Sequence, residues 1–196
     1  PEKAQDGEIA EAEYLVLPQS AESNARILKE SVGNNDSTLA ENADNLEVKI
    51  TLQTPDGKQI SFSDGKCLVE DPKLWWPNGY GAQNLYTFKA CCVTKGILHE
   101  MQPKKIGIRT LELDTSKLED GSRNFFFKVN GVRIFCKGGN WVPTDSLYLR
   151  TPKESYETLV REGAAAHFTM FRMWGGGTYE PDCFYEYCSE YGILLM

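Results

Sequence analysis

Two glycine-rich segments of the sequence combine tryptophan with polar side chains. The first, KGGNWVPTD, holds Asn140, Trp141 and Asp145, and the second, FRMWGGGTYEPD, holds Arg172 and Trp174. The flat face of an indole suits the C–H face of a sugar ring, and amide or carboxylate groups bond to its hydroxyls. Glycines beside an indole let the backbone approach a ligand closely or adopt a positive φ. These segments are candidates for a carbohydrate pocket, and packing of both indoles in a core is the alternative.

Arg172 raises a separate question of charge. Strand alternation places Arg172 and Trp174 on one face, and Phe171 and Met173 on the other. An inward arginine needs a partner because an unpaired buried charge is costly. The pattern therefore indicates a carboxylate partner, for which the sequence offers no evident candidate. Neither segment is a G-x-G-x-x-G motif opening into a helix, so a phosphate cradle is disfavoured.

The elements around the two segments alternate in type. An Asn130–Gly131 turn predicts a hairpin whose second strand covers 133–136, with KGGNWVPTD as the loop that follows it. Thr151 as N-cap, Pro152 at the first helical position and Glu154 two positions later predict a helix start. We expect that helix to end at His167.

Three further elements complete the second half. The pattern predicts a strand over 169–174, a helix starting at Pro181 and a strand over 193–196. An order of strand, helix, strand, helix, strand is typical of parallel βαβ units. A doubly wound sheet and a (β/α)₈ barrel both fit, and both place ligands at the carboxyl ends of the strands.

The first half has period two. Alternating apolar residues from Leu46 to Leu52, followed by the turn Asp56–Gly57, predict a hairpin. We expect further strands over 84–93 and 105–113 and no helix before about residue 150, so the first half is predicted to be a β-sandwich. Residues 19–45 are weakly patterned and receive no assignment.

Composition excludes several classes of protein. A net charge of −7 on 196 residues argues against a nucleic-acid partner. No apolar run approaches the roughly 20 residues that span a bilayer, and PEKAQDGEIAEAE is too polar for a signal peptide, so no membrane partner is expected and the localisation stays open. Six cysteines without C-x-x-C spacing and two histidines make a zinc site improbable. We expect no cofactor and buried free thiols, with the redox compartment open.

Four motifs together resemble glycoside hydrolase family 2, and most closely its β-mannosidase branch. They are DPKLWWPNGYGAQNLY, KKIGIRTLEL, FKVNGVRIFCKGGNW and FRMWGGGTYEPDCFYEYCSEYGILL, and the resemblance is specific from about Asp71 to Met196. It implies a multidomain β plus α/β fold. Residues 1–112 would form an immunoglobulin-like β-sandwich, and residues 113–196 the incomplete start of a TIM barrel. LWWPNGYG would then be structural, and the Asn130–Gly131 hairpin would cap the bottom of the barrel.

The resemblance also implies an activity. Such enzymes are retaining exo-glycosidases, here removing terminal β-linked mannose from oligosaccharides or glycoconjugates, with two glutamates about 5 to 5.5 Å apart. In the family these glutamates come from the fourth and seventh barrel strands. We therefore expect both to lie beyond Met196 and the chain alone to be inactive. Glu180 and Glu186 receive no catalytic role.

The site residues implied by the resemblance are those of the two glycine-rich segments. Trp174 would contact the non-reducing sugar, Asn140, Trp141 and Asp145 would face the same pocket, and Arg172 would pair with the nucleophile and keep it ionised. The partner is thus a β-linked oligosaccharide or glycoconjugate, and the oligomeric state stays open.

Two alternatives remain. Met196 stands where mannosidase-like sequences usually have Trp, whereas exo-β-glucosaminidases often have Met near there but lack W-G-G-G. An exo-β-glucosaminidase or another family 2 β-glycosidase is therefore the runner-up. The alternative from another class is a non-catalytic carbohydrate-binding or scaffold module in which the sandwich is the working part.

Overall fold

The computed structural model describes residues 14–16, 47–63, 66–94, 97–147 and 150–196. Residues 19–45, which the sequence left unassigned, lie outside these ranges.

The chain divides into two compact units. Unit 1 comprises Pro1–Pro72 and Tyr86–Lys104, and unit 2 comprises Lys73–Leu85 and Lys105–Met196. Segment 73–85 therefore groups with the second half of the chain. The predicted domain boundary between residues 112 and 113 stays a prediction.

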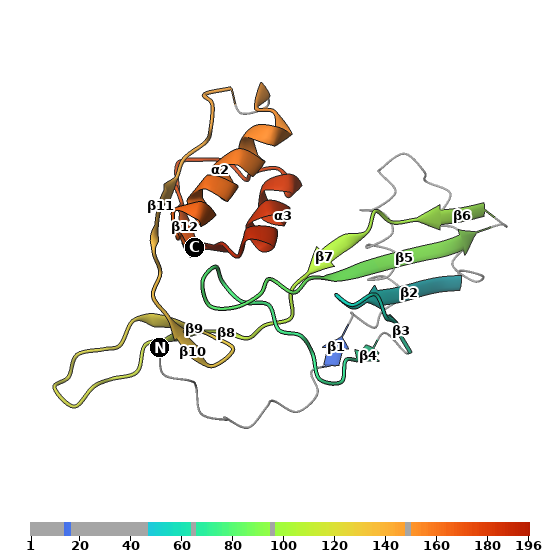
Figure 1. Cartoon of the computed structure of the whole chain (residues 1–196), viewed down its shortest axis with the longest axis horizontal. Helices are drawn as coiled ribbons and strands as arrows, with labels where there is room; N and C mark the ends of the chain where they lie inside the picture. Colours follow the sequence, from blue (N-terminus) through green and yellow to red (C-terminus); the bar gives the residue numbers. More distant parts are fainter. Residues whose placement is uncertain (1–13, 17–46, 64–65, 95–96, 148–149) are drawn as a thin grey trace. The chain divides into compact units, whose positions relative to one another are not determined.

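Unit 1 consists of antiparallel strands, which fit the predicted β-sandwich (Figure 1). One sheet has the order β3-β2-β5-β6, and β1 pairs with β4 in another. The bounds are β1 (Tyr14–Val16), β2 (Glu47–Gln53), β3 (Gln59–Ser61), β4 (Lys66–Leu68), β5 (Tyr86–Thr94) and β6 (Ile97–Glu100). The predicted hairpin at Asp56–Gly57 is confirmed, with Gly57 at φ 89° between β2 and β3. Period-two burial is seen in β5, where Ala90 and Cys92 are buried and Cys91 is less so, whereas Leu52 is the one fully buried residue of β2 among those described.

Unit 2 begins with antiparallel strands. Its first sheet has the order β10-β9-β8, with bounds β8 (Leu111–Asp114), β9 (Phe126–Val129) and β10 (Val132–Ile134). The predicted turn at Asn130–Gly131 is confirmed: both residues have positive φ, 51° and 76°, as a two-residue hairpin turn requires. The single strand predicted over 105–113 is wrong. It is two strands, β7 (Lys104–Ile106) and β8, because the backbone between them turns to accept the N–H of Trp75 at Ile108 O.

A parallel sheet with two helices follows. The order is β11 (Gly138–Trp141), α2 (Lys153–Ala165), β12 (Met170–Met173), α3 (Asp182–Tyr191) and β13 (Leu194–Leu195). Strand β12 pairs in parallel with both β11 and β13, so the predicted βαβαβ order is confirmed. The choice between a doubly wound sheet and a barrel stays a prediction.

The start of this sheet differs from expectation. Residues 138–141 were expected in a loop but form β11, whereas the strand expected over 133–136 is β10 of the hairpin. The glycines that suggested a loop serve a close approach instead. A Cβ on Gly138 would lie 1.7 Å from the carbonyl oxygen of Met170, so only glycine allows the two strands to pair there.

The start of α2 also differs. The helix begins at Lys153 with Pro152 as its N-cap residue and no side-chain cap. The hydroxyl of Thr151, expected to cap the helix, lies 2.8 Å from the hydroxyl of Thr144 instead. The helix ends at Ala165, and His167 follows with φ 62°, a left-handed conformation that turns the chain toward β12.

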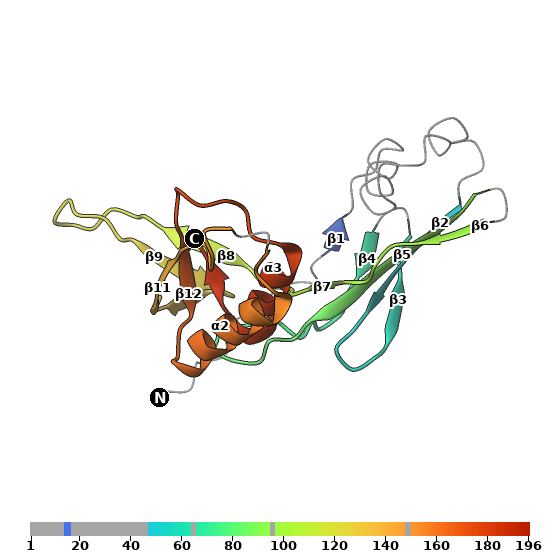
Figure 2. The ribbon, with the colours of Figure 1, turned by 90° about the horizontal axis from the view of Figure 1, so that it is seen from above.

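Both helices cover one face of the parallel sheet (Figures 1 and 2). Between them and the strands lies a buried core of Trp141, Tyr156, Val160, Phe171, Phe184, Cys188 and Ile193. Alternation along β12 sends Phe171 into this core and Arg172 to the opposite face. That opposite face is called the open face below. Among the described residues, no helix is long and apolar enough to cross a bilayer.

Segment 73–85 ties unit 2 together, as expected for a structural motif. The indole N–H of Trp75 donates to Ser189 O at 2.7 Å. The side-chain amide of Asn78 donates to Ala164 O at 2.8 Å and to Phe168 O at 3.0 Å, so it satisfies carbonyls at the end of α2. The predicted Asn78–Gly79 turn is confirmed, with Gly79 at φ 81°. Trp75 is 1% exposed and packs with hairpin residues and the amino ends of β12 and β13.

Candidate functional site

Asn140 and Arg172 lie opposite each other on the open face of the parallel sheet. They are paired in register near the carboxyl ends of β11 and β12, and both are exposed. The Arg172 guanidinium donates to Asn140 Oδ1 at 3.4 Å. Within the described residues Arg172 makes no ion pair, so its charge is available to an anionic group that approaches this face. The structure thus brings these two predicted site residues together.

Trp174 follows β12 directly and is half-exposed, at 50%. Its backbone N–H donates to Trp141 O at 2.9 Å, which continues the ladder between β11 and β12. The N–H of Gly177 then donates to Trp174 O at 3.1 Å and closes a tight turn. The chain reverses direction here, and the indole stays at the carboxyl end of the sheet with part of its surface free.

The glycines after Trp174 have different roles. A Cβ on Gly176 would lie 2.5 Å from Cζ2 of the Trp174 indole, whereas a Cβ on Gly175 would meet nothing within 4 Å. The indole therefore lies against the backbone at Gly176, and only glycine permits that position. This contact explains the glycine at position 176, and nothing in the structure requires one at position 175.

Trp141 lies on the face opposite Asn140 and Arg172. It is 7% exposed and packs against Phe184 and Phe171, with ring centroids 4.5 Å and 5.2 Å away. Its indole N–H donates to Glu180 Oε1 at 2.9 Å. Direct contact of Trp141 with a sugar stays a prediction, and the contacts described here are packing and hydrogen-bonding contacts inside unit 2.

Glu180 is the functional candidate that the sequence did not single out. Its side chain is 6% exposed, one of the two buried polar residues of the described chain. Tyr156 lies beside it: burial raises the pKa of Tyr156, and the nearby Glu180 carboxylate raises it further, while the Thr144 hydroxyl opposes the shift. The sequence offered only a general signal for Glu180: a buried indole N–H, here that of Trp141, requires an acceptor.

Asp145 lies in the loop between β11 and α2, away from the Arg172 contact. Its carboxylate accepts from Arg150 Nε at 2.9 Å and from the backbone N–H of Leu147 at 2.8 Å. The hydrogen bond from Arg150, followed by that from Leu147, lowers the pKa of Asp145. This carboxylate is ionised at neutral pH, and its bonds hold the loop in shape. Its predicted contact with a sugar stays a prediction.

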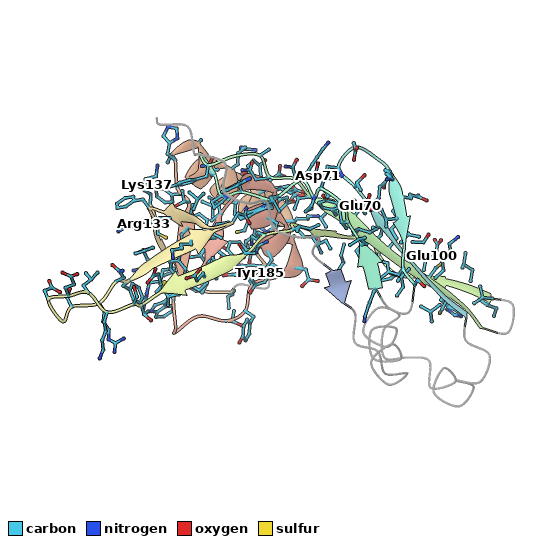
Figure 3. All side chains as sticks on the ribbon, turned by 90° about the horizontal axis from the view of Figure 1, so that it is seen from below. Glu70, Asp71, Glu100, Arg133, Lys137 and Tyr185 are labelled. Carbon is cyan, nitrogen blue, oxygen red and sulfur yellow. The ribbon has the colours of Figure 1, made fainter. Side chains whose placement is uncertain are left out.

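A hollow of about 480 Å³ lies toward the amino end of the same sheet. Aromatic residues of the hairpin, together with Met170 and Met196, line much of it. Arg133, labelled in Figure 3, stacks over the Phe126 ring at 4.1 Å. Phe125 and Phe135 are 69% and 74% exposed. The surface here is strongly apolar.

Comparison with known proteins identifies the family. The family model described as "Glycosyl hydrolases family 2" matches residues 11–109, which is half of the chain. The chain belongs to glycosyl hydrolase family 2. The family resemblance stated from the sequence is thereby confirmed.

The chain is similar in sequence to several proteins named beta-mannosidase B. The chain is 38% identical to beta-mannosidase B of Emericella nidulans over 144 residues, covering 71% of this chain and 17% of the relative. It is 39% identical to beta-mannosidase B of Aspergillus niger over 158 residues, covering 76% and 18%. The chain therefore spans less than a fifth of the length of these relatives.

Solved structures of two glycosidases share the fold. The beta-D-mannosidase of Dictyoglomus thermophilum matches with a TM-score of 0.66 and 36% identity, over 76% of this chain and 20% of that one. The beta-glucuronidase of Parabacteroides merdae matches with a TM-score of 0.61 and 17% identity, over 80% and 20%, which supports the fold alone. The chain is thus a family 2 member whose sequence is similar to those of beta-mannosidases.

Proposed function

We propose that this chain is part of a retaining, exo-acting β-mannosidase-type hydrolase that removes terminal β-linked mannose from oligosaccharides or glycoconjugates. One observation carries the proposal: Asn140 and Arg172 lie side by side at the carboxyl ends of parallel strands, and the half-exposed indole of Trp174 follows directly. The names of the relatives support it. An indole for the C–H face of a sugar, an amide for its hydroxyls and a cation for an anionic group form a suitable set.

Each side chain has a proposed role. Trp174 contacts the non-reducing sugar, Asn140 binds a hydroxyl, and Asp145 approaches the same pocket from its loop. Arg172 pairs with the nucleophilic carboxylate and lowers its pKa, so that it stays ionised for attack. Both catalytic glutamates are supplied from outside these 196 residues, so the chain alone does not hydrolyse glycosides.

The parallel strands are proposed to be the first three of a TIM barrel. The open face supports this, because it combines the uncovered charge of Arg172 with the exposed apolar side chains Phe135 and Met196. Further strands would bury the apolar part and would bring a carboxylate to the arginine. The hairpin of β9 and β10 then closes the amino end, where Val129 and Ile134 already pack on Met170.

A kinetic experiment tests the proposal in a protein that contains this chain and the remainder of a β-mannosidase-like sequence. Trp174→Ala should lower kcat/KM for an aryl β-mannoside on the order of 10- to 100-fold, the scale of losing a dominant aromatic contact. Unchanged kinetics with an unchanged melting temperature would defeat the site. Faster turnover of an aryl β-glucosaminide than of the mannoside would favour the runner-up within the family.

A second candidate function, a non-catalytic carbohydrate-binding module, has one observation in its favour. A hollow of about 490 Å³ lies over the polar face of the unit 1 sheet, where Lys49, Thr51 and Lys89 are among the lining residues. Calorimetric titration of the whole chain with manno-oligosaccharides separates the two candidates. Heat abolished by Lys49→Ala and Lys89→Ala but kept in Trp174→Ala would favour the module, and the reverse pattern would favour the β-mannosidase-type site.

A further inference from the structure

Trp141 holds both ends of the loop that carries Trp174. Its backbone carbonyl accepts the N–H of Trp174 at the start of the loop, at 2.9 Å. Its indole N–H donates to the carboxylate of Glu180 at the end of the loop, also at 2.9 Å. One residue of β11 thus fixes a seven-residue segment through its main chain on one side and its side chain on the other.

Few other contacts hold that loop among the described residues; one is the approach of Gly177 to Pro143, whose ring would lie 3.5 Å from a Cβ at position 177. Tyr179 is 93% exposed, and Gly175 has open space around it. The internal contacts are the turn from Gly177 N–H to Trp174 O and the seating of the indole on Gly176. The position of the Trp174 side chain therefore depends on where the ends of the loop are held.

The anchor at Glu180 is well buried. Glu180 is 6% exposed, and its carboxylate interacts with the Trp141 indole and with Tyr156 of α2. Near Tyr156, the hydroxyls of Thr144 and Thr151 meet at 2.8 Å. A buried carboxylate is unfavourable unless it is hydrogen-bonded, so an apolar side chain would fill this place at lower cost if packing were its only role. A polar residue in this place instead fixes geometry between β11, α2 and the loop.

We propose that Glu180, acting through Trp141, is a positioning residue that sets the place of the Trp174 indole at the sugar subsite. The inference rests on the proposed function only in that Trp174 touches the sugar. Glu180 itself contacts no substrate and takes no part in proton transfer. Trp141 likewise affects Trp174 only through the loop, because its side chain lies on the helix-covered face of the sheet.

The test is hydrogen exchange in the 196-residue chain with ¹⁵N-labelled tryptophan and backbone amides, without sugar. Glu180→Leu removes the acceptor and keeps an apolar side chain of similar size, whereas Glu180→Gln keeps an oxygen that accepts from the indole. In Glu180→Leu, exchange of the Trp141 indole N–H and of the Trp174 backbone N–H should each rise about ten-fold, the scale of one lost hydrogen bond. In Glu180→Gln both should stay within about two-fold of the unsubstituted chain.

A control amide separates positioning from general stability. The N–H of Ile193 donates to Cys188 O at the carboxyl end of α3, the end further along the chain from Glu180. If Glu180 only stabilises the fold, exchange at Ile193 and Trp174 will rise together in Glu180→Leu. That result would overturn the proposal, as would a Trp174 amide that does not change while the Trp141 indole is released.

A second variant covers the case in which Glu180→Leu does not fold. Trp141→Phe keeps a ring in the core and removes the indole donor, so it should accelerate the Trp174 amide by the same factor. In the double variant the effect should be no larger than in either single variant, because both break one interaction. A folded Trp141→Phe variant with unchanged exchange at Trp174 would overturn the proposal. A failure of the mannoside kinetics would remove the proposed function and leave these exchange results standing.

Discussion

The indole nitrogen of Trp75 lies 2.7 Å from the carbonyl oxygen of Ser189, which is 114 residues further along the chain. Ser189 is in the last turn of α3, where carbonyl groups lack partners within the helix. Asn78 serves the end of α2 in the same way. Segment 73–85 thus completes the ends of both helices that cover the parallel sheet.

Loss of the Trp75 donor should destabilise unit 2. Trp75→Phe keeps an aromatic ring but leaves Ser189 O without its bond, so the free energy of unfolding should fall by about 1–3 kcal/mol. Urea unfolding followed by near-ultraviolet circular dichroism measures this change. Trp76→Phe is the matched control, because Trp76 is only half-buried, and it should cost less. Equal effects of the two substitutions would contradict the role given to Trp75.

The two glycines after Trp174 form a matched pair for a second experiment. Gly176→Ala would place a methyl group 2.5 Å from the indole, so the indole must move, whereas Gly175→Ala meets nothing within 4 Å. We expect Gly176→Ala to change the chemical shift of the Trp174 indole N–H and its quenching by acrylamide. Gly175→Ala should leave both unchanged. The same response in both variants would show that the indole does not lie on Gly176.

The carboxylate of Asp114 gives a prediction on pH. Hydrogen bonds from the side chain and backbone of Ser116, and then the ammonium of Lys128, hold the pKa of Asp114 below its usual range. Because the folded-state pKa is lowered, the stabilisation is present above the unfolded pKa of about 3.9 and is lost as pH falls through the folded value. Ser116→Ala should raise the pKa of Asp114 and reduce this loss in acid.

A carbon-13 titration of the aspartate carboxyl groups measures that effect. Asp120 is the internal control, because Ser122 lowers its pKa through the same two hydrogen bonds but without a lysine. Ser122→Ala should raise the pKa of Asp120 and leave that of Asp114 where it is. A Ser116→Ala variant with an unchanged Asp114 titration would assign the shift to the backbone N–H of residue 116 and to Lys128, and would contradict the role given to the Ser116 hydroxyl.

The cysteines should differ sharply in reactivity. Burial raises the pKa of Cys188 to about 12, and this thiol lies in the core of unit 2. Cys136 is exposed, so the expectation of buried thiols is wrong for this cysteine. Alkylation of the native chain with iodoacetamide near pH 8, followed by peptide mass mapping, should modify Cys136 first and Cys188 only after unfolding, because the thiolate is the reactive form. Early modification of Cys188 would indicate that the core opens readily.

Local turn chemistry was predictable from the sequence. Asn130–Gly131, Asn78–Gly79 and Asp56–Gly57 all form the expected turns, because few residues adopt a positive φ at low cost. The order of helices and strands after residue 150 also followed from the periodicity, whereas β11 did not. These features depend on neighbouring residues alone.

The side on which each site residue lies was harder to predict. With residues 138–141 assigned to a loop, Asn140 and Trp141 were expected to face one pocket together. As neighbours in β11 they must face opposite sides, so Asn140 meets Arg172 and Trp141 enters the helix-covered core. The glycines of β11 are required by the carbonyl of Met170, a contact more than 30 residues away that no local pattern reveals.

The bond between Trp75 and Ser189 also has a consequence for synthesis on the ribosome. At about 5–20 residues per second, the 114 residues between donor and acceptor take roughly 6 to 23 s to translate. During that time the indole of Trp75 has emerged and its acceptor has not been made. All residues of unit 1 precede Lys105, so they are made early, whereas unit 2 needs Ser189 in the last turn of α3. A nascent chain therefore holds the Trp75 donor for many seconds before its acceptor at Ser189 has been made.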